Sequence, residues 1–267
     1  MNILVCVKQV PDTMEVKIDE ENNRLIRDGV PYTVNPFDSN AVELAVRMKE
    51  RYGACVTVLS MGPVQASESL RECLAVGADD AFLISGREFG GSDTLATSRV
   101  LSEGIKKIAA NKGIGAFDLI LCGRQSSDSD TAQVGPETAE FLAIPQVTYA
   151  TDIEKTDAGF IVTQAADGRI NRLSVTAPCL VTIGKIAGFP RYSNMMSKIA
   201  SMSAAVPVLS AEDLPAVNPE TVGLLGSPTK MTGMQAPKKM KSGEILDGGM
   251  GEIIPRVAEI LADQGFI

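Results

Sequence analysis

The chain has 267 residues, and its 25 Lys and Arg against 33 Asp and Glu give a formal net charge of -8 at pH 7. This length allows one large or two small domains with a buried core, and the acidic balance argues against a surface for nucleic acid or anionic membranes. The complete absence of histidine excludes His-ligated metal sites and catalysis by Ser-His-Asp or Cys-His groups.

The five cysteines are widely spaced and include no C-x-x-C pair, so zinc-ribbon, iron–sulfur and thioredoxin-type sites lack their ligands. Free thiols are typical of a reducing compartment. The apolar residues 1–7 lack a basic leader and run directly into Lys8, which indicates a strand rather than a signal peptide. No apolar stretch approaches the length of a membrane span. We therefore expect a cytoplasmic protein without a membrane segment.

The first half of the chain alternates short apolar runs with helical patterns. The apolar runs, which do not alternate with polar residues, are 3–7, 55–59, 81–84 and 117–122. Helical apolar stripes lie between them at 41–48, 66–74 and 100–109. This order predicts a parallel sheet whose strands are buried on both faces, with right-handed crossovers. A small hairpin with a turn at Asn22 and Asn23 is expected to interrupt the first crossover.

The pattern changes after Pro145. Segments of period two at 146–153, 160–165, 170–175 and 180–183 predict an antiparallel edge to the same sheet. From 188 to about 251 no segment has a clear apolar period, and a final amphipathic helix is predicted at 253–262. This stretch is either disordered or an extended arm that packs on another protein, and we expect the arm because the stretch still carries apolar side chains.

Ligands of an open parallel sheet bind beyond the carboxyl ends of its strands. The loops at those ends are 8–13, 60–63, 85–94 and 123–136. The last combines small residues and hydroxyls with the start of a helix, and Arg124 adds a positive charge. Two interpretations stay open: the loop cradles a pyrophosphate on its amides, or it is a polar surface loop in which Asp130 or Thr131 caps the helix. Asp128 and Asp130 could also suggest a magnesium pair, but such carboxylates are usually solvated.

Two other stretches give weaker signals. Residues 90–94 resemble the adenylate-forming loop of ATP pyrophosphatases but lack its leading serine, and Asp93 or Thr94 fits better as a helix cap. Asn35 and Pro36 begin another helix, where a plain helix start is as good an interpretation as a ligand contact. Neither a P-loop nor a G-x-G-x-x-G motif occurs. Without a nucleophile beside a base, any chemistry is expected to come from a bound cofactor.

Five stretches together resemble the beta subunit of electron transfer flavoprotein. They are 7–12 (VKQVPD), 35–43 (beginning NPFD), 90–97, 123–136 and 178–182. The resemblance implies an α/β fold: a parallel-sheet nucleotide-binding domain of the adenine nucleotide alpha hydrolase and universal-stress type, with antiparallel edge strands and an extended C-terminal arm. It implies three parts. They are 1–188 as the nucleotide-binding domain, 189–203 as a partner-recognition loop, and 204–267 as an arm packed on the alpha subunit.

The family divides by its beta-subunit nucleotide, which is a structural AMP in the housekeeping type and a second FAD in the electron-bifurcating type. Residues 131–137 and 91–97 resemble the bifurcating type, which implies FAD here with AMP as the alternative. The resemblance implies no catalytic or metal-binding residue. The cofactor-binding residues that it implies are Lys8, Gln9, Val10, Asn35, Asp38, Met61, Asp93, Thr94, Thr97, Gly123, Arg124, Gln125, Asp128, Asp130, Thr131, Ala132, Gln133 and Val134.

In the bifurcating type, NADH gives a hydride to this FAD. One electron then passes to ferredoxin or flavodoxin, and the other passes through the second FAD to an acyl-CoA or related dehydrogenase. Redox activity would belong to the heterodimer and its dehydrogenase complex rather than to this subunit alone. The implied partner-recognition residues are Pro190, Arg191, Tyr192, Met195 and Met196. The alternatives from other classes are an ATP- or AMP-binding stress-type module and an ATP-dependent ligase that uses residues 90–94.

Overall fold

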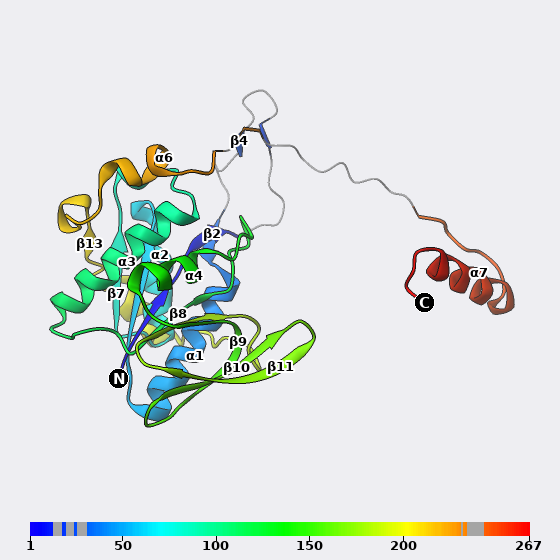
Figure 1. Cartoon of the computed structure of the whole chain (residues 1–267), viewed down its shortest axis with the longest axis horizontal. Coiled ribbons are helices and arrows are strands. Elements are labelled where there is room, and N and C mark those ends of the chain that lie inside the picture. The colour runs from blue at the N-terminus through cyan, green and yellow to red at the C-terminus, as the bar shows by residue number, and fades with distance from the viewer. Residues whose placement is uncertain (13–17, 20–23, 26–30, 231, 234–242) are drawn as a thin grey trace.

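The computed structural model of the chain describes residues 1–12, 18–19, 24–25, 31–230, 232–233 and 243–267. They form an α/β fold around a nine-stranded sheet of order β11-β10-β9-β12-β8-β1-β6-β7-β13 (Figure 1). This architecture is the predicted mixed α/β fold, with a mostly parallel sheet that ends in antiparallel strands.

The predicted inner strands form the parallel centre of the sheet. They are β1 (Asn2–Cys6), β6 (Cys55–Met61), β7 (Asp80–Ile84) and β8 (Leu119–Gly123). The helices that cover them are α1 (Pro36–Tyr52), α2 (Ser67–Val76), α3 (Thr94–Asn111) and α4 (Val134–Leu142). Successive residues of β1 enter opposite cores, since Ile3 lies in the cluster with α1 and α2, and Leu4 in the cluster with α3 and α4. The apolar runs do not alternate because both faces are covered.

The predicted antiparallel edge is confirmed for three strands and wrong for a fourth. The three strands are β9 (Gln146–Lys155), β10 (Gly159–Ala166) and β11 (Arg169–Thr176). The fourth segment, β12 (Cys179–Ile183), pairs in parallel with both β8 and β9 and is therefore an inner strand. All five of its residues are buried, so it needs no polar face, and its short apolar run is that of a parallel strand.

The first crossover carries two short antiparallel ladders. β2 (Gln9–Pro11) pairs with β5 (Tyr32–Val34), and β3 (Ile18–Asp19) pairs with β4 (Arg24–Leu25). The second ladder is the arrangement expected of the predicted hairpin, whose turn at Asn22 and Asn23 lies outside the described residues.

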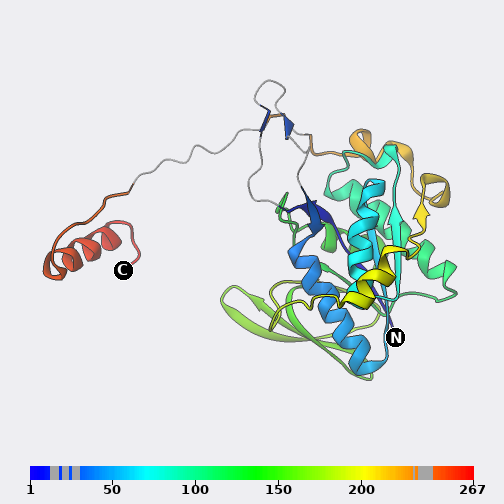
Figure 2. The same cartoon turned by 180° about the vertical axis from the view of Figure 1, so that it is seen from behind.

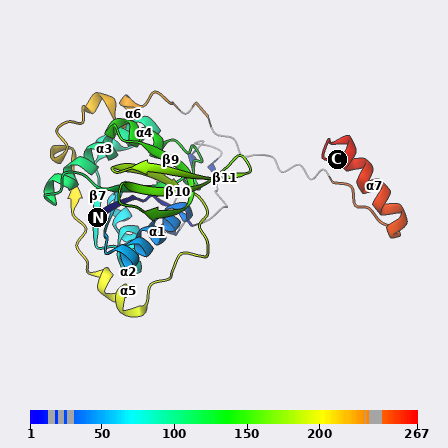
Figure 3. The same ribbon diagram turned by 60° about the horizontal axis from the view of Figure 1, so that its bottom comes forward.

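The segment after β12 differs from the expected arm, because much of it packs on the chain's own sheet. Helix α5 (Met195–Met202) lies beside α2 (Figure 2, Figure 3), and β13 (Val208–Leu209) pairs in parallel with β7. Leu209, Leu214 and Val222 then join the core on the side of α3 and α4. The elements here are too short to produce an apolar period, which is why the sequence does not reveal them. They include η3 (Ala211–Asp213), η4 (Pro219–Thr221) and α6 (Gly223–Gly226).

The predicted C-terminal helix is confirmed as α7 (Met250–Asp263). It lies away from the sheet in Figure 1, and its apolar residues Met250, Ile254 and Leu261 are exposed. Two further short helices, η1 (Val64–Ala66) and η2 (Arg87–Phe89), follow β6 and β7. Among the described residues, no helix has both the length and the apolar content needed to cross a membrane.

Candidate functional site

A buried carboxylate joins two loops at the carboxyl end of the sheet. Asp38, in the first turn of α1, accepts hydrogen bonds from the amide of Lys8 at 2.7 Å and from the amide of Gly123 at 2.8 Å. A Cβ at position 123 would lie 2.4 Å from Asp38 Oδ1, so this approach requires glycine. Burial raises the pKa of Asp38 to about 7, although the amides of Lys8 and Gly123 and the side chain of Asn35 favour its charged form.

Asn35 fastens the same loop at a second point. Its side-chain amide donates to the carbonyl of Gln125 at 2.8 Å, and its oxygen accepts from the amide of Ser127 at 3.2 Å. Although Asn35 is the residue before α1, its side chain makes no capping hydrogen bond. Since this side chain is only 1% exposed, it supports the loop from inside. We call residues 7–10, 35–38 and 123–134 the loop cluster.

Lys8 supplies a cation to the loop cluster. Its ammonium lies 2.7 Å from Asp128 Oδ1, 3.4 Å from Ser126 Oγ and 3.3 Å from Ser129 Oγ. Burial alone would raise the pKa of Asp128, but the hydrogen bond and charge of Lys8 hold that pKa below its usual range. The ammonium therefore sits among loop oxygens, where an anionic ligand could compete for it.

The second half of the loop leaves backbone donors free. Asp130 and Ala132 have φ angles of 59° and 57°, a region that side chains other than glycine rarely adopt. Within the described part of the chain, the amides of Thr131, Ala132 and Gln133 donate no hydrogen bond. Such alternating backbone turns its amides into one concavity and binds anions, and strain of this kind concentrates at ligand sites.

The start of α4 tests the helix cap that one of the two sequence interpretations of this loop contains. The residue before α4 is Gln133, and no side chain caps the helix. The expectation that Asp130 or Thr131 caps it is wrong, because Asp130 instead accepts a short hydrogen bond from the side chain of Gln125. The uncapped amides at the positive end of the α4 dipole favour the anion cradle.

The start of α3 lies beside that of α4. Asp93 caps α3 through the amide of Ala96 at 3.0 Å, which confirms the predicted cap. Its other carboxylate oxygen accepts from the amide of Thr229 at 2.9 Å. Burial would raise the pKa of Asp93, but these amides hold it below its usual range. Thr94 Oγ1 lies 3.4 Å from the side chain of Gln133, so the two helix starts meet at the loop cluster.

Arg124 has two aromatic neighbours that the sequence does not single out as site residues. Its guanidinium carbon lies 4.8 Å from the ring centre of Phe37 and 5.8 Å from that of Tyr149. Phe37 adjoins Asp38 in the chain, which is a usable signal. Tyr149 belongs to β9 and is brought in only by the sheet, so its position has no sequence signal.

The remaining predicted cofactor residues make their contacts with other parts of the fold. Gln9 donates to Ser69 Oγ at 3.1 Å and so faces α2, and the side chain of Val10 is only 1% exposed. Met61 ends β6 and packs partly on the core, and Thr97 lies in the first turn of α3. The structure thus gathers the residues at 8, 35, 38, 94 and 123–134, while Val10 is part of the core.

The two loop carboxylates have partners of their own. Asp128 pairs with Lys8, and Asp130 accepts from Gln125. Among the residues that the structure describes, no group of three or more Cys, Asp or Glu side chains gathers as a metal site would require. Nothing in the geometry therefore favours the magnesium interpretation.

A second surface lies on the other side of α1. We call residues 189–203 the strap, since they run across α1 and α2. Arg191 binds Glu43 at 2.8 Å and Glu50 at 2.5 Å, and these carboxylates raise its pKa above the ordinary value. Arg47 donates to the carbonyl of Ala187 at 3.0 Å just before the strap. Of the predicted recognition residues, Arg191 is therefore an anchor to α1.

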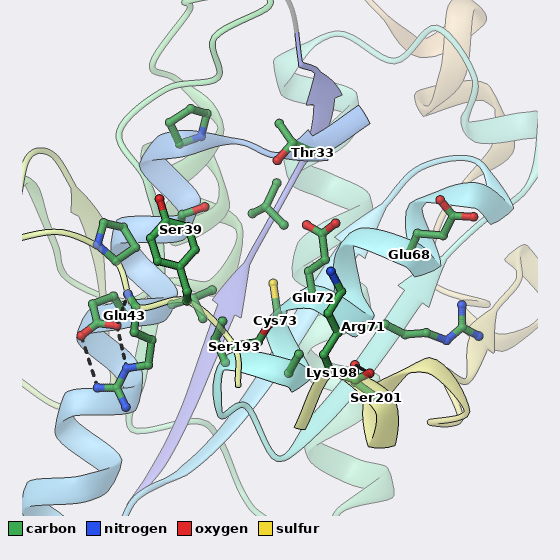
Figure 4. A pocket seen from close by; sticks show the side chains of 18 of the residues that line it. Thr33, Ser39, Glu43, Glu68, Arg71, Glu72, Cys73, Ser193, Lys198 and Ser201 are labelled. Atoms are coloured by element: carbon green, nitrogen blue, oxygen red, sulfur yellow. Dashed lines mark hydrogen bonds and ion pairs between the residues drawn. The ribbon is translucent and has the colours of Figure 1, made fainter. Parts of the chain in front are cut away.

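Beyond this anchor the strap displays apolar side chains. The strongly exposed ones are Phe189, Tyr192, Met195, Met196, Ile199 and Met202. Beneath the strap lies a cavity of about 1200 Å³ between α1 and α2, lined by Glu72, Cys73 and Lys198 among others (Figure 4). Burial raises the pKa of Glu72 in this cavity. An exposed apolar stretch on a fixed backbone is typical of a protein-binding surface.

Comparison with known proteins identifies relatives over the full chain. A sequence family described as the electron transfer flavoprotein domain matches residues 23–214, which include the strap and loop 123–134. The chain is 45% identical over 262 residues to an electron transfer flavoprotein subunit beta of Thermoanaerobacterium thermosaccharolyticum, with 98% of each chain covered. It is also 45% identical over 281 residues to the subunit beta of Megasphaera elsdenii, with 100% of each covered.

A third relative is the caffeyl-CoA reductase-Etf complex subunit CarD of Acetobacterium woodii. The identity is 45% over 249 residues, which cover 93% of this chain and 92% of CarD. The name of that relative describes a subunit of a complex between caffeyl-CoA reductase and Etf.

Proposed function

The chain belongs to the electron transfer flavoprotein family, as a full-length relative of its beta subunits, and from this premise we propose that it binds FAD in the loop cluster of a heterodimer that bifurcates the electrons of NADH. The observation that carries this proposal is the group of amides at Thr131, Ala132 and Gln133, which donate to no described residue, in a loop that also contains Arg124 and is bound by Lys8.

The loop cluster fits the diphosphate of a dinucleotide. The loop cluster offers three amides that donate to no described residue, the uncapped start of α4 and the cations Lys8 and Arg124. Together these groups provide hydrogen bonds and positive charge for an anion. Gly135 strengthens the fit, because a Cβ there would lie 2.6 Å from Thr182 and 2.8 Å from Cys122, so only glycine lets α4 start this close to the sheet.

FAD held there would supply the chemistry for taking two electrons from NADH and giving them up singly, one to ferredoxin or flavodoxin and one, through a second FAD, to an acyl-CoA or related dehydrogenase. The residues of this chain bind the nucleotide and set the charge around it. Asn35 and Asp38 hold the loop in shape, the amides at 131–133 receive the diphosphate, and Arg124 stabilises negative charge on the nucleotide. Thr94 and Thr97, at the start of α3, lie toward the flavin end.

Two features support FAD over AMP. The stretch from Thr131 to Glu137 reads TAQVGPE, which resembles the bifurcating type. In addition, the relative CarD is named as a subunit of a reductase-Etf complex. A housekeeping carrier with a structural AMP remains the second candidate, because one phosphate fits the same amides.

Within this proposal, each exposed apolar surface is matched to one protein partner. The apolar face of α7 and the exposed Leu224 and Leu225 fit an alpha subunit that this chain's C-terminal arm contacts. The apolar strap fits the flavin-dependent dehydrogenase. The acidic net charge of -8 argues against nucleic acid as a partner.

The test is to co-express the chain with its alpha subunit, purify the complex without oxygen, precipitate the protein with acid and count the released nucleotides. We expect two FAD and no AMP per heterodimer. One FAD with one AMP would contradict bifurcation and support the housekeeping carrier. ATP without flavin would contradict the flavin assignment as a whole.

Arg124→Ala tests the role of the loop cluster. Because charge-assisted hydrogen bonds contribute about 1.5–3 kcal/mol, we expect the FAD of this site to bind at least about tenfold more weakly or its reduction to shift. The matched control is Arg99→Ala, which removes an arginine 5.3 Å from the ring of Phe141. Unchanged flavin content and spectra in Arg124→Ala would contradict the assignment.

A further inference from the structure

Arg124 is held by rings rather than by hydrogen bonds. Its guanidinium lies over Phe37 and Tyr149, and its Nε is buried without a partner among the described residues. Its side chain donates no hydrogen bond to any residue that the structure describes, although its own amide is fixed to the carbonyl of Ile183 at 2.8 Å. A buried guanidinium donor without an acceptor is costly, so this arrangement needs a compensating role.

Tyr149 reaches Arg124 through an irregularity of the sheet. The register of β9 against β12 shifts between Val181 and Ile183, and Tyr149 at this point has a φ of 56°. Its amide donates to Thr182 Oγ1 at 3.1 Å instead of to a strand carbonyl. A positive φ at a bulky residue is a true outlier, and bulges next to active sites commonly re-aim a side chain. Here the bulge leaves the ring 38% exposed beside the guanidinium.

Phe37 provides the second ring from a different element. It lies in the first turn of α1, between the supporting residues Pro36 and Asp38. The position of this ring is therefore tied to the same turn that fastens loop 123–134. Two elements that are distant in sequence thus meet at one guanidinium, which restricts its motion. Because fixing a flexible cation before binding reduces the entropy lost on binding, such a cage increases affinity for an anion.

We propose that Tyr149, with Phe37, is a positioning residue of the nucleotide site, which fixes Arg124 so that its remaining donors serve an anionic group of the bound nucleotide. The inference rests on the proposed function only in placing a nucleotide at the loop cluster. The anionic group is a phosphate of FAD or AMP, or the negative charge of reduced FAD, and the test separates these sources.

The experiment is a double-mutant cycle on the full heterodimer, freed of nucleotide and titrated separately with FAD and with AMP. Since a cation–π contact is worth about 0.5–2 kcal/mol, Tyr149→Ala should raise the Kd of the bound nucleotide roughly threefold to thirtyfold. Tyr149→Phe should restore the wild-type Kd because it keeps the ring. In Arg124→Ala, adding Tyr149→Ala should change the Kd less than twofold, since the two residues act as a unit.

The reduction potential of the FAD of this site gives a readout that a purely structural role would not move. If the relevant anion is reduced FAD, Tyr149→Ala and Arg124→Ala should both make this potential more negative. If it is a phosphate, the Kd should change and the potential should not. The control Tyr52→Ala removes a ring 5.1 Å from Arg51, remote from the loop cluster, and should change neither quantity.

Additive effects in the double variant, or an unchanged Kd in Tyr149→Ala, would overturn the proposal. The nucleotide count tests the proposed function separately from the positioning role. A site that holds AMP would refute bifurcation, while coupling between Tyr149 and Arg124 in the AMP titration would still support the positioning role.

Discussion

The loop cluster and the strap are incomplete in opposite ways. In loop 123–134 Gln125 is paired with Asp130 and Ser126 with Ser129, while the backbone amides at 131–133 have no acceptor among the described residues. In the strap the polar anchor Arg191 is paired, and the apolar side chains between 192 and 202 have no cover. Under the proposed function, the first surface is completed by an anionic group of the nucleotide, and the second by the apolar face of another protein. Helix α1 supports both, because Asp38 holds the loop and Glu43 holds the strap.

The largest effect is expected from Gly123→Ala, which disturbs the loop cluster and not the strap. The new Cβ would lie 2.4 Å from Asp38 Oδ1 and 2.8 Å from its backbone nitrogen, which cannot move without α1. We expect a loss of about 3 kcal/mol in the free energy of unfolding and a loss of bound nucleotide.

Chemical denaturation and nucleotide counting measure these effects. Gly115→Ala is the matched control, because a Cβ there meets nothing within 4 Å. Wild-type nucleotide content in Gly123→Ala would show that Asp38 does not set the loop.

The next effect is a dependence of stability on pH that comes from Asp38 in the loop cluster. The pKa of Asp38 is raised from 3.8 to about 7, so the folded chain retains a proton that the unfolded chain releases. The stability should therefore fall as pH rises from about 4 to about 7 and then level off, by at most about 1.4 kcal/mol per pH unit.

Asp38→Asn cannot titrate, and it isolates this contribution. The difference in thermal stability between wild-type and Asp38→Asn heterodimers, measured from pH 4 to 8, should favour the wild type most at the acid end. A difference that grows in favour of the wild type with rising pH would contradict the prediction.

Arg191→Ala should release the strap and leave the loop cluster intact. The variant loses the side-chain hydrogen bonds to Glu43 and Glu50, while Glu43 keeps Arg47 and the backbone amide of residue 191 as donors. Since the loss of a charged hydrogen bond costs about 1–2 kcal/mol, trypsin should cleave after Lys198 about tenfold faster. Arg172→Ala, which removes an exposed pair with Glu154 on the sheet edge, should not change this rate. An unchanged cleavage rate in Arg191→Ala would show that the strap is fixed elsewhere.

The smallest effect on stability is expected from Met195→Ser combined with Met196→Ser. Both side chains are exposed, at 74% and 77%, so the free energy of unfolding should change by no more than about 0.5 kcal/mol. Electron transfer to the flavin dehydrogenase should nevertheless slow. Ser197→Ala nearby serves as the control. Electron transfer at the wild-type rate would show that Met195 and Met196 are not part of the surface that docks the dehydrogenase.

The order of strands and helices could be predicted because covered parallel strands and amphipathic helices leave strong patterns. The cap at Asp93 was equally readable, since its partner Ala96 is three residues away. The contact of Lys8 with Asp128 is not readable in that way, because 120 residues separate them and only the sheet brings them together.

Other features depend on contacts that leave no local pattern. A segment of apparent period two is expected to be an antiparallel edge strand, but β12 pairs in parallel with β8 and β9. The packing of Leu209 and Leu214 on the sheet involves strands and turns of two or three residues. The approach of Tyr149 to Arg124 depends on a register shift between strands, which no spacing encodes.

The strap separates the residues that hold it from those that it displays. Arg191 and Arg47 anchor its first end, and the carbonyl of Ala204, bound by Arg71, anchors its other end. Exposed positions between these anchors can accept substitutions without loss of fold, because the backbone path does not depend on them. Under the proposed function, the choice of redox partner can therefore drift within a dozen residues over evolutionary time without changing loop 123–134, which Asp38 holds from the first turn of α1.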